Sequence, residues 1–338
     1  MTSVKKNLTT LGYVTINNNH GFNEGHNGFQ ISPRMQELMV YAGQMDSYDN
    51  CNEIIKSFTN IEVSAAQVYR LTDLYGHEVG KQAVMRILEP LKQQEVLYVQ
   101  ADGSMILTRD NSWSEVKLGR IFKSSDCLHP VAKQGWISNS QYVAHLGNHK
   151  KFCRQMDDLI DDFGPLKQRL VFITDGAPWL GNWIEDSFAQ SISVLDFYHA
   201  TEHLHAFCAE VFKDKQLQQH WFEQQKELLL ESRLDDAIQN ISQQGRHKSK
   251  EVEKLISYYN NNRDRMNYKK YHSIGCGIIG SGAIESAHRT VIQKRMKQSG
   301  QRWSTPGAQN MLNLRVVRKN QQWSKIVELA KTNFKQAA

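Results

Sequence analysis

Three acidic residues that lie far apart in the chain occupy positions from which carboxylates could bind a metal ion. Asp102 lies at the end of an expected strand, Asp175 directly follows the apolar run LVFIT, and Glu285 lies in the first turns of an expected helix. Carboxylates at the carboxyl ends of strands face the crevice where sheet proteins bind ligands. Two Asp and one Glu suit hard ions such as Mg²⁺ or Mn²⁺, which share phosphate oxygens with a substrate. The three acids are therefore candidate ligands of a divalent cation.

Each of these acids also has an ordinary structural role open to it. Asp102 precedes Gly103, a pair that is typical of a hairpin turn. Asp175 precedes Gly176 and could cap the next helix, and Glu285 could complement the positive end of a helix. Spacing alone does not choose between these roles and metal binding.

The elements that must position the acids alternate between strands and helices. Residues 96–103, 104–110 and 115–123 are rich in β-branched and aromatic residues and predict an antiparallel meander. The order of elements then becomes helix, strand, helix, strand, and the first of these two strands is apolar on both faces, as in a central strand covered by helices. The ranges are 151–164, 170–174, 177–189 and 191–199. This order predicts an α/β fold with five strands.

The regions around this core have a different character. Residues 1–31 are polar without periodicity and predict a flexible arm. Residues 32–94 contain three short helical patterns, the third with Ser64 as its N-cap. Such a module could be a helix-turn-helix that presents Gln67 and Arg70 to DNA, although ordinary helical packing gives the same pattern.

A long polar stretch after the last strand predicts an all-helical insertion over residues 214–271, because it is rich in Gln, Lys and Glu and almost free of Pro. The glycine-rich run GCGIIGSG then marks a turn, and a final long helix follows it. The expected core therefore comprises residues 95–213 and 272–323, and residues 324–338 form a basic tail.

Charge is distributed unevenly along the chain. Residues 154–236 hold 16 Asp and Glu against 7 Lys and Arg, whereas residues 286–338 hold 11 Lys and Arg against Glu328 alone. Clustered cations favour a polyanion partner, because each contact with a phosphate releases condensed counterions. A solvated basic surface without a partner is the alternative, and charge alone leaves both open.

The composition predicts a soluble, cytoplasmic protein with no membrane contact. The chain has 338 residues, of which 40% are hydrophobic and 22% charged, and no apolar run approaches the ~18 residues that a membrane span needs. No apolar stretch of signal-peptide length follows the first residues. The five cysteines are scattered without a C-x-x-C pair, which argues against a disulfide framework and a zinc ribbon.

Several long segments resemble one known family. They are VQADGSMILTRD, WSEVKLGRIF, VFITDGAPWLGNW, VLDFYHATEHL and GSGAIESAHRTVIQKRMKQSGQRWSTPGAQNMLNLR. From about Ser32 to about Trp323 the chain is similar to DDE transposases of bacterial insertion sequences, in particular the ISKra group of the Mutator-like set. The resemblance implies a ribonuclease-H-like core, which is a mixed five-stranded sheet flanked by helices, with an all-helical insertion and an N-terminal helical module.

The resemblance also implies roles for individual residues. In that family two Asp and one Glu hold the catalytic metals, and the matching positions are Asp102, Asp175 and Glu285. A C/D-x-x-H motif corresponds to Asp196 and His199, so that His199 would contact the scissile phosphate or orient a carboxylate, with Asp196 in support. Alternatively, His199 could have the purely structural role of fixing the start of a helix. The residues expected along the DNA are Arg289, Lys294, Arg295, Lys297, Arg302 and Trp303, although Trp303 could equally anchor the core.

The activity implied by the resemblance is cleavage and strand transfer of double-stranded DNA with Mg²⁺ or Mn²⁺. The expected partners are the ends of a transposon, the target DNA and further copies of the chain, in a homodimer or a larger assembly on DNA. Two alternatives stay open: a ribonuclease-H-like nuclease or resolvase that cuts without joining, and a DNA-binding remnant without catalysis.

Overall fold

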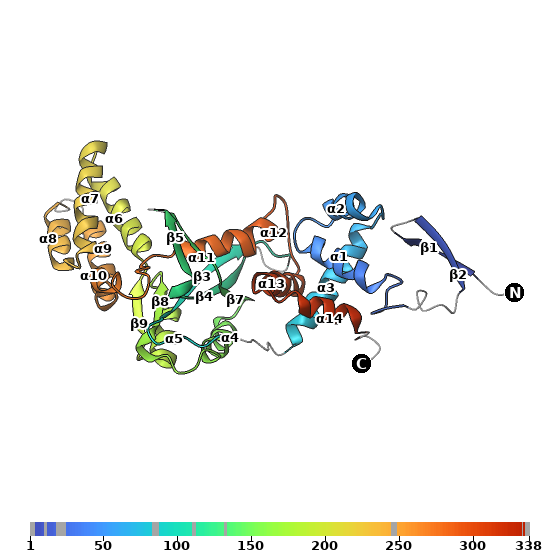
Figure 1. The fold of residues 1–338 in the computed structure, drawn as a ribbon. Coiled ribbons are helices and arrows are strands. Elements are labelled where there is room, and N and C mark those ends of the chain that lie inside the picture. The colour runs from blue at the N-terminus through green and yellow to red at the C-terminus, as the bar shows by residue number, and fades with distance from the viewer. Residues whose placement is uncertain are drawn as a thin grey trace.

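The protein is elongated, with the central sheet between two helical regions. In the computed structural model the helices α6 to α10 lie at one end, and the N-terminal helices and a small hairpin lie at the other (Figure 1). The described residues are 4–9, 12–17, 25–82, 88–109, 113–131, 134–244, 249–332 and 334.

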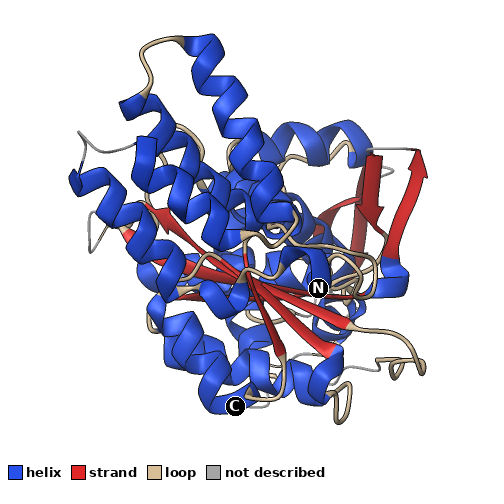
Figure 2. Cartoon of the chain, turned by 90° about the vertical axis from the view of Figure 1, so that its left-hand side faces the viewer, coloured by secondary structure: helices blue, strands red, loops and turns tan. Residues whose placement is uncertain are grey.

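The core is a mixed sheet of five strands in the order β7-β4-β3-β8-β9. The strands are β3 (Leu97–Ile106), β4 (Ser114–Lys123), β7 (Gln141–Leu146), β8 (Leu170–Thr174) and β9 (Ile192–Leu195). Strand β4 is antiparallel to both of its neighbours, whereas β3, β8 and β9 run parallel. Helices lie on both sides of the twisted sheet (Figure 2). The predicted α/β class and a sheet of five strands are confirmed, but the five strands are not the five predicted ones.

The predicted meander differs from the structure in its first two strands. Residues 96–103 and 104–110 do not turn back on each other at Gly103, because β3 continues through this glycine and pairs it with Lys117 on β4. A ladder of ten paired positions with the next strand prevails over a local Asp-Gly turn signal. The third strand of the sheet is β7, which the sequence did not indicate. Strands β5 (Cys127–Val131) and β6 (Gln134–Ile137) form a separate hairpin.

Helices cover the two faces of the sheet with separate hydrophobic clusters. On one face α4 (His149–Asp161) and α5 (Pro178–Phe188) pack onto β3 and β8, and Phe172 and Trp183 meet edge to face at 5.4 Å between ring centroids. On the other face lie α6 (Phe197–Val211) and the helices that follow it. Strand β8 is buried along its whole length, as its apolar pattern predicts.

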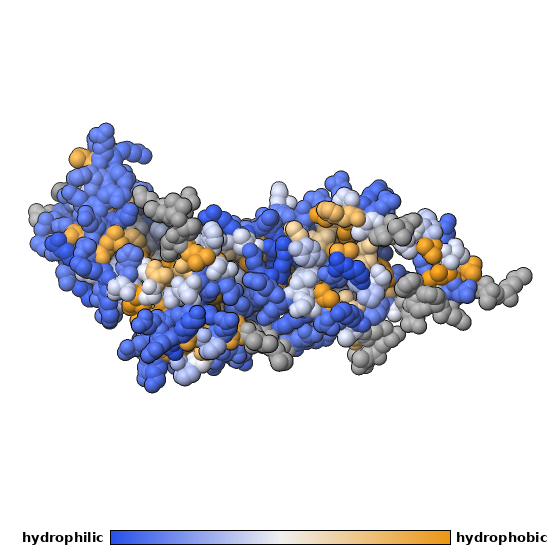
Figure 3. Space-filling model, in the orientation of Figure 1, coloured by the Kyte–Doolittle hydropathy of each residue, from blue (hydrophilic) through white to orange (hydrophobic). Residues whose placement is uncertain are grey.

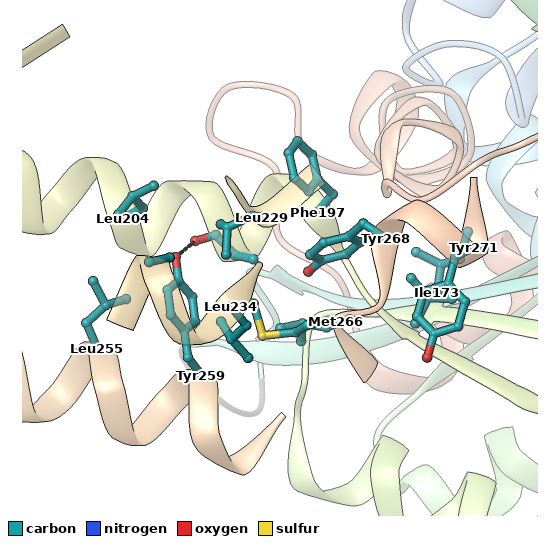
Figure 4. Packing of buried hydrophobic residues seen from close by; sticks show 14 of the residues in the cluster. Ile173, Phe197, Leu204, Leu229, Leu234, Leu255, Tyr259, Met266, Tyr268 and Tyr271 are labelled. Carbon is teal, nitrogen blue, oxygen red and sulfur yellow. Dashed lines mark hydrogen bonds between the residues drawn. The ribbon is translucent and has the colours of Figure 1, made fainter. Parts of the chain in front are cut away.

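The segment that follows α6 contains helices and, in its described part, no strand. The helices are α7 (Lys215–Leu230), α8 (Leu234–Gln244), α9 (Ser249–Asn261), a short 3₁₀ turn (Arg263–Arg265) and α10 (Tyr268–Tyr271). Tyr259 is fully buried in their core, and its hydroxyl donates a hydrogen bond to the carbonyl of Ala200 on α6 at 3.0 Å (Figure 4). The same cluster extends to Val194 and Tyr98, so these helices are fastened to the sheet.

The N-terminal helices pack against the C-terminal ones. They are α1 (Pro33–Gly43), α2 (Asn50–Thr59) and α3 (Ala65–Lys81), with α13 (Thr305–Lys319) and α14 (Ser324–Lys331). Ser64 caps α3 as predicted. A Cβ added at Gly76 would collide with the backbone of Asn310, so α3 and α13 approach closely. The space-filling view shows hydrophobic residues gathered over α1 and α2, where Phe58 is 87% exposed (Figure 3).

Two terminal segments have more structure than their composition indicates. Within the arm expected over residues 1–31, β1 (Val4–Thr9) and β2 (Gly12–Asn17) pair as antiparallel strands. Within the expected tail, α14 buries Ile326 and Leu329 against the N-terminal helices. None of the helices in the described part of the chain is long and apolar enough to cross a membrane.

Candidate functional site

Asp102 and Glu285, which are 183 positions apart, line one pocket. Asp102 lies in the middle of β3, not at its end, and Glu285 lies on α11 (Gly282–Ala287). The pocket has a volume of about 310 Å³. Its other lining residues are Gly103, Ser104, His288, Arg289 and Gln293. The side chain of Asp102 is 38% exposed, and Glu285 is exposed as well. Both carboxylates are therefore open to a ligand.

Asp175 directly follows β8, the strand next to the one that carries Asp102. The last paired positions of these two parallel strands are Gln100 and Ile173, two residues before each acid. Thr174 pairs with Leu195 on β9, and Asp196 follows that strand. Asp175 also caps the next turn, because its Oδ1 accepts a hydrogen bond from the amide of Ala177 at 3.0 Å.

Asp175 is not among the residues that line the pocket of Asp102 and Glu285. Within the described ranges, no three His, Cys, Asp or Glu side chains lie close enough to hold one ion together. The structure thus brings two of the predicted acids into one pocket and the third to the adjacent strand end.

The turn before Glu285 is held by two buried side chains of the sheet. Gln100 on β3 donates to the carbonyl of Gly280 at 3.0 Å and accepts from the amide of Ile284 at 2.8 Å. Arg120 on β4 donates to the carbonyl of Ala283 at 2.7 Å. Gln100 is fully buried, and burial lowers the pKa of Arg120. Since buried backbone groups without partners are costly, these bonds fix where α11 begins.

Asp196 ties the same turn to α6. Its carboxylate caps this helix by accepting from the amides of Tyr198 and His199, and Oδ1 also accepts from the amide of Ser281 at 2.8 Å. The side chain of Ser281 in turn donates to Glu285 at 2.8 Å. Burial raises the pKa of Asp196, and its hydrogen bonds with Ser281 act in the opposite direction. Asp196 thus holds the start of α6 and the turn before Glu285 together through three backbone donors.

His199 lies on the first turn of α6 and does not line the pocket of Asp102. Its side chain is 44% exposed, and its Nδ1 lies 3.8 Å from Asp196 and 3.7 Å from Glu202. The neighbouring ring of His203 lies on Tyr258, with 4.2 Å between ring centroids. These contacts do not test whether His199 binds the scissile phosphate, so that role stays a prediction.

A half-buried arginine of the helical insertion lies at the end of β8. Arg265 donates to the hydroxyl of Thr174 at 2.6 Å, directly before Asp175. Burial lowers the pKa of Arg265, while Tyr258 and Asp175 act to raise it. This arginine, which the sequence did not indicate, joins the insertion to the strand that carries Asp175.

His288 is the pocket residue that sequence reasoning missed. The helix after α11 widens into a π-helix over His288–Gln293 before α12 (Lys294–Met296). The Nε2 atom of His288 lies 3.2 Å from Oδ2 of Asp102. The available signal was its spacing, because a residue three positions after Glu285 shares a helix face with it.

The basic residues predicted to lie along DNA divide into exposed and buried ones. Arg289, Lys294 and Arg302 are exposed, and Lys297 is exposed with its ammonium bonded to Ser104 at 2.7 Å. The prediction for Arg295 is wrong, because this side chain is fully buried and donates to the carbonyl of Gly43 at 2.8 Å.

Trp303 serves as the core anchor that the sequence left open. It is 6% exposed, its indole nitrogen donates to the carbonyl of Met296 at 3.1 Å, and the guanidinium of Arg295 lies 5.2 Å from its ring. Both side chains are buried in this arrangement, and Arg295 contacts Gly43 of α1 and Tyr48 of the segment after it.

Comparison with known proteins places the chain in a family. The family model of the uncharacterised protein family UPF0236 matches residues 27–333. The chain belongs to UPF0236. A curated relative, the "UPF0236 protein in vanSb 3'region" of Streptococcus gallolyticus, is 23% identical over 303 residues, which are 86% of this chain and 64% of the relative. The chain thus spans less than two thirds of that relative's length.

The range matched by UPF0236 includes every residue that the sequence nominated for the site. Two of them lie on α3, far from the pocket along the chain. The side chain of Gln67 completes a capping box by accepting from the amide of Ser64 at 3.2 Å, whereas Arg70 is exposed. Of the pair, Arg70 is the one with a free surface for DNA.

The donor set at the pocket fits a hard divalent cation. Asp102 and Glu285 offer carboxylate oxygens, the ligands that Mg²⁺ and Mn²⁺ prefer. Such ions keep several waters and share phosphate oxygens with a substrate, so one or two protein carboxylates per ion are sufficient.

Proposed function

We propose that this UPF0236 chain is a DDE transposase, which cleaves DNA strands at the ends of an insertion sequence and joins them to target DNA with Mg²⁺ or Mn²⁺. One observation carries the proposal: Asp102 and Glu285 share a pocket although 183 positions separate them, and Asp175 directly follows the adjacent parallel strand. Ordinary capping or turn roles give no reason for Asp102 and Glu285 to meet.

The order of elements supports the same function. Strands β3 and β8 are the first and fourth strands of the sheet along the chain, and Glu285 lies on a helix after a helical insertion. This is the order of the catalytic acids in the DDE transposases that the sequence resembles. A ribonuclease-H-like core is therefore part of the proposal.

In this mechanism the protein supplies positions and charges. Asp102, Asp175 and Glu285 hold the cations, whose chemistry when bound is to activate an attacking water or 3′-hydroxyl and to stabilise the leaving oxygen. Gln100 and Arg120 fix the turn that carries Glu285, so little reorganisation is needed as charge develops.

The exposed cations next to the acids supply the DNA contacts. Arg289 lines the pocket itself, and Lys294 and Arg302 are exposed close to it in sequence. A scissile phosphate at the acids leaves the flanking backbone within reach of such side chains, which bind phosphates without regard to sequence.

The test is a strand-cleavage and strand-transfer assay on duplex DNA that carries the inverted repeats flanking the gene. We expect nicked and joined products with Mg²⁺ or Mn²⁺, and neither product from Asp175→Asn or Glu285→Gln. Glu185→Gln, an exposed change on α5, is the matched control. Cutting without joining would favour the nuclease, and cleavage that is unaffected by Asp175→Asn would refute the assignment.

The assembly is tested by sedimentation on the same DNA. A transposase must bring two ends together, so we expect two or more protomers on paired ends. A complex that contains one protomer at all concentrations would contradict this part of the proposal.

A further inference from the structure

His288 is a buried imidazole without a hydrogen bond. It is 5% exposed, and neither ring nitrogen has a hydrogen-bond partner. Its Nε2 nevertheless lies 3.2 Å from a carboxylate oxygen of Asp102, and the residue lines the pocket that Asp102 shares with Glu285. Buried polar groups normally have hydrogen-bond partners, because an unpaired group loses its hydrogen bonds with water and gains none in the protein. Such a group at the wall of a candidate metal site calls for a functional explanation.

The local helix geometry directs His288 toward Asp102. His288 is the first residue of the π-helix, and the buried residues Val291 and Ile292 of the same segment pack against the sheet. Single π turns inside helices occur frequently at functional sites, because they change which residues share a face. Here Glu285 and His288 both reach the pocket while the apolar residues stay in the core.

Asp102 can accept a bond from His288 and still bind a cation. Its Oδ1 already accepts from the amide of Gly103 at 2.7 Å, and Oδ2 faces His288. Each carboxylate oxygen has two lone pairs, so both oxygens keep one for a metal ion. Bonds of this kind orient the carboxylate ligands of metal sites and raise metal affinity.

We propose that His288 is a positioning residue for Asp102: when the cation is bound, Nε2–H donates to Oδ2, which lies 3.2 Å away, and holds the carboxylate plane in the orientation that binds the cation. The inference rests on the proposed function, because it gives His288 a role toward the same metal. His288 acts through Asp102 and is not a ligand, since imidazole nitrogen is a poor donor for Mg²⁺.

The test measures Mn²⁺ binding by the full chain with electron paramagnetic resonance, for the wild type, His288→Leu and His288→Gln. Leucine keeps the bulk and removes the donor, whereas the glutamine amide can donate near the position of Nε2. We expect the Kd for Mn²⁺ to rise about 10-fold or more in His288→Leu and to return most of the way in His288→Gln.

Thermal unfolding of the same variants separates positioning from packing. His288→Leu removes an unpaired buried polar group, so we expect it to unfold at the same temperature as the wild type or higher while it binds Mn²⁺ more weakly. A purely structural histidine would show lowered stability and unchanged Mn²⁺ binding, which would overturn the inference. Equal loss of binding in His288→Gln and His288→Leu would also overturn it.

The outcomes distinguish this inference from the proposed function. Wild-type Mn²⁺ binding with the same affinity in His288→Leu contradicts the inference alone. Absence of Mn²⁺ binding by the wild type, or unchanged binding in Asp102→Asn, contradicts the proposed function and the inference together. In the cleavage assay, the Mn²⁺ concentration for half-maximal rate should rise in His288→Leu while the KM for DNA stays constant.

Discussion

Asp102 on β3 and Asp196, which follows β9 of the same sheet, have opposite surroundings. The side chain of Asp196 is 2% exposed, and its oxygens accept from three backbone amides. The side chain of Asp102 is 38% exposed and accepts from one amide, with the imidazole of His288 beside it. Burial with several backbone donors suits a carboxylate that fixes loops, whereas free lone pairs beside a pocket suit one that binds a ligand. Burial and hydrogen-bond partners, more than residue type or position on the sheet, distinguish a structural carboxylate from a candidate ligand-binding one.

The arginines after Glu285 show the same division. Arg295 is fully buried against Tyr48 and Trp303, whereas Arg289 lies at the pocket and is exposed. Six positions apart on one helical stretch, they face the core and the solvent respectively. Substitution of the buried arginine should therefore affect the stability of the fold, and substitution of the exposed one should affect DNA binding.

The largest effect is expected from Asp102→Asn. The amide keeps the shape of the side chain but is a much weaker metal ligand, so we expect DNA cleavage to fall by roughly 10³-fold or more, which is about 4 kcal/mol in the barrier. Because Asp102 is partly exposed, unfolding free energy should change by less than about 0.5 kcal/mol. Cleavage rates and urea unfolding check both statements. If the Asp102→Asn chain cleaved DNA at the wild-type rate, the proposed division between a catalytic Asp102 and a structural Asp196 would be wrong.

Arg295→Ala should lower the stability of the fold. The change removes a fully buried side chain and its bond to Gly43, which we expect to lower unfolding free energy by about 3 kcal/mol. Lys294→Ala, the exposed neighbour, is the control and should stay within about 0.5 kcal/mol of the wild type. If Arg295→Ala instead kept full stability and lost DNA binding, our account of this helix would be wrong.

Asp196→Ala should destabilise the fold by about 2 kcal/mol, since it removes a helix cap and leaves the amide of Ser281 without its partner. Asp214 offers a matched comparison, because it caps α7 with two amides and has no third bond to a distant turn. We expect Asp214→Ala to cost about 1 kcal/mol. Equal losses in urea unfolding would show that the bond to Ser281 contributes nothing.

Arg289→Ala should have the smallest effect and only on DNA. One lost phosphate contact lowers affinity by about 1 kcal/mol and reduces the slope of log K against log salt by about 1. Fluorescence anisotropy over a range of salt concentrations measures both, and the melting temperature should not move. An unchanged salt slope would exclude Arg289 from the interface.

Local chemistry explains what could be predicted from the sequence. The cap at Ser64, the buried strand Leu170–Thr174 and the helix over residues 177–189 depend on side chains within a few positions of each other, and all three predictions are confirmed. The nomination of Asp102 and Glu285 came from residue type, element order and family resemblance, and the structure brings this pair into one pocket.

The features that could not be predicted depend on contacts between separate segments of the chain. Strand β3 continues through Gly103 because β4 pairs with it, and Arg295 is buried because α1 and the segment that follows it lie above it. His288 required both the π turn and the position of Asp102, which no local pattern contains. Tertiary contact decided each case.

The most direct test of the account is a crystal of the full chain soaked in Mn²⁺ and measured at the manganese absorption edge. The account predicts anomalous density in the pocket, within coordinating distance of the carboxylates of Asp102 and Glu285, and its loss in Asp102→Asn. A soaked wild-type crystal without density there, or with Mn²⁺ bound only at other acids, would contradict the claim that these distant residues form a metal site.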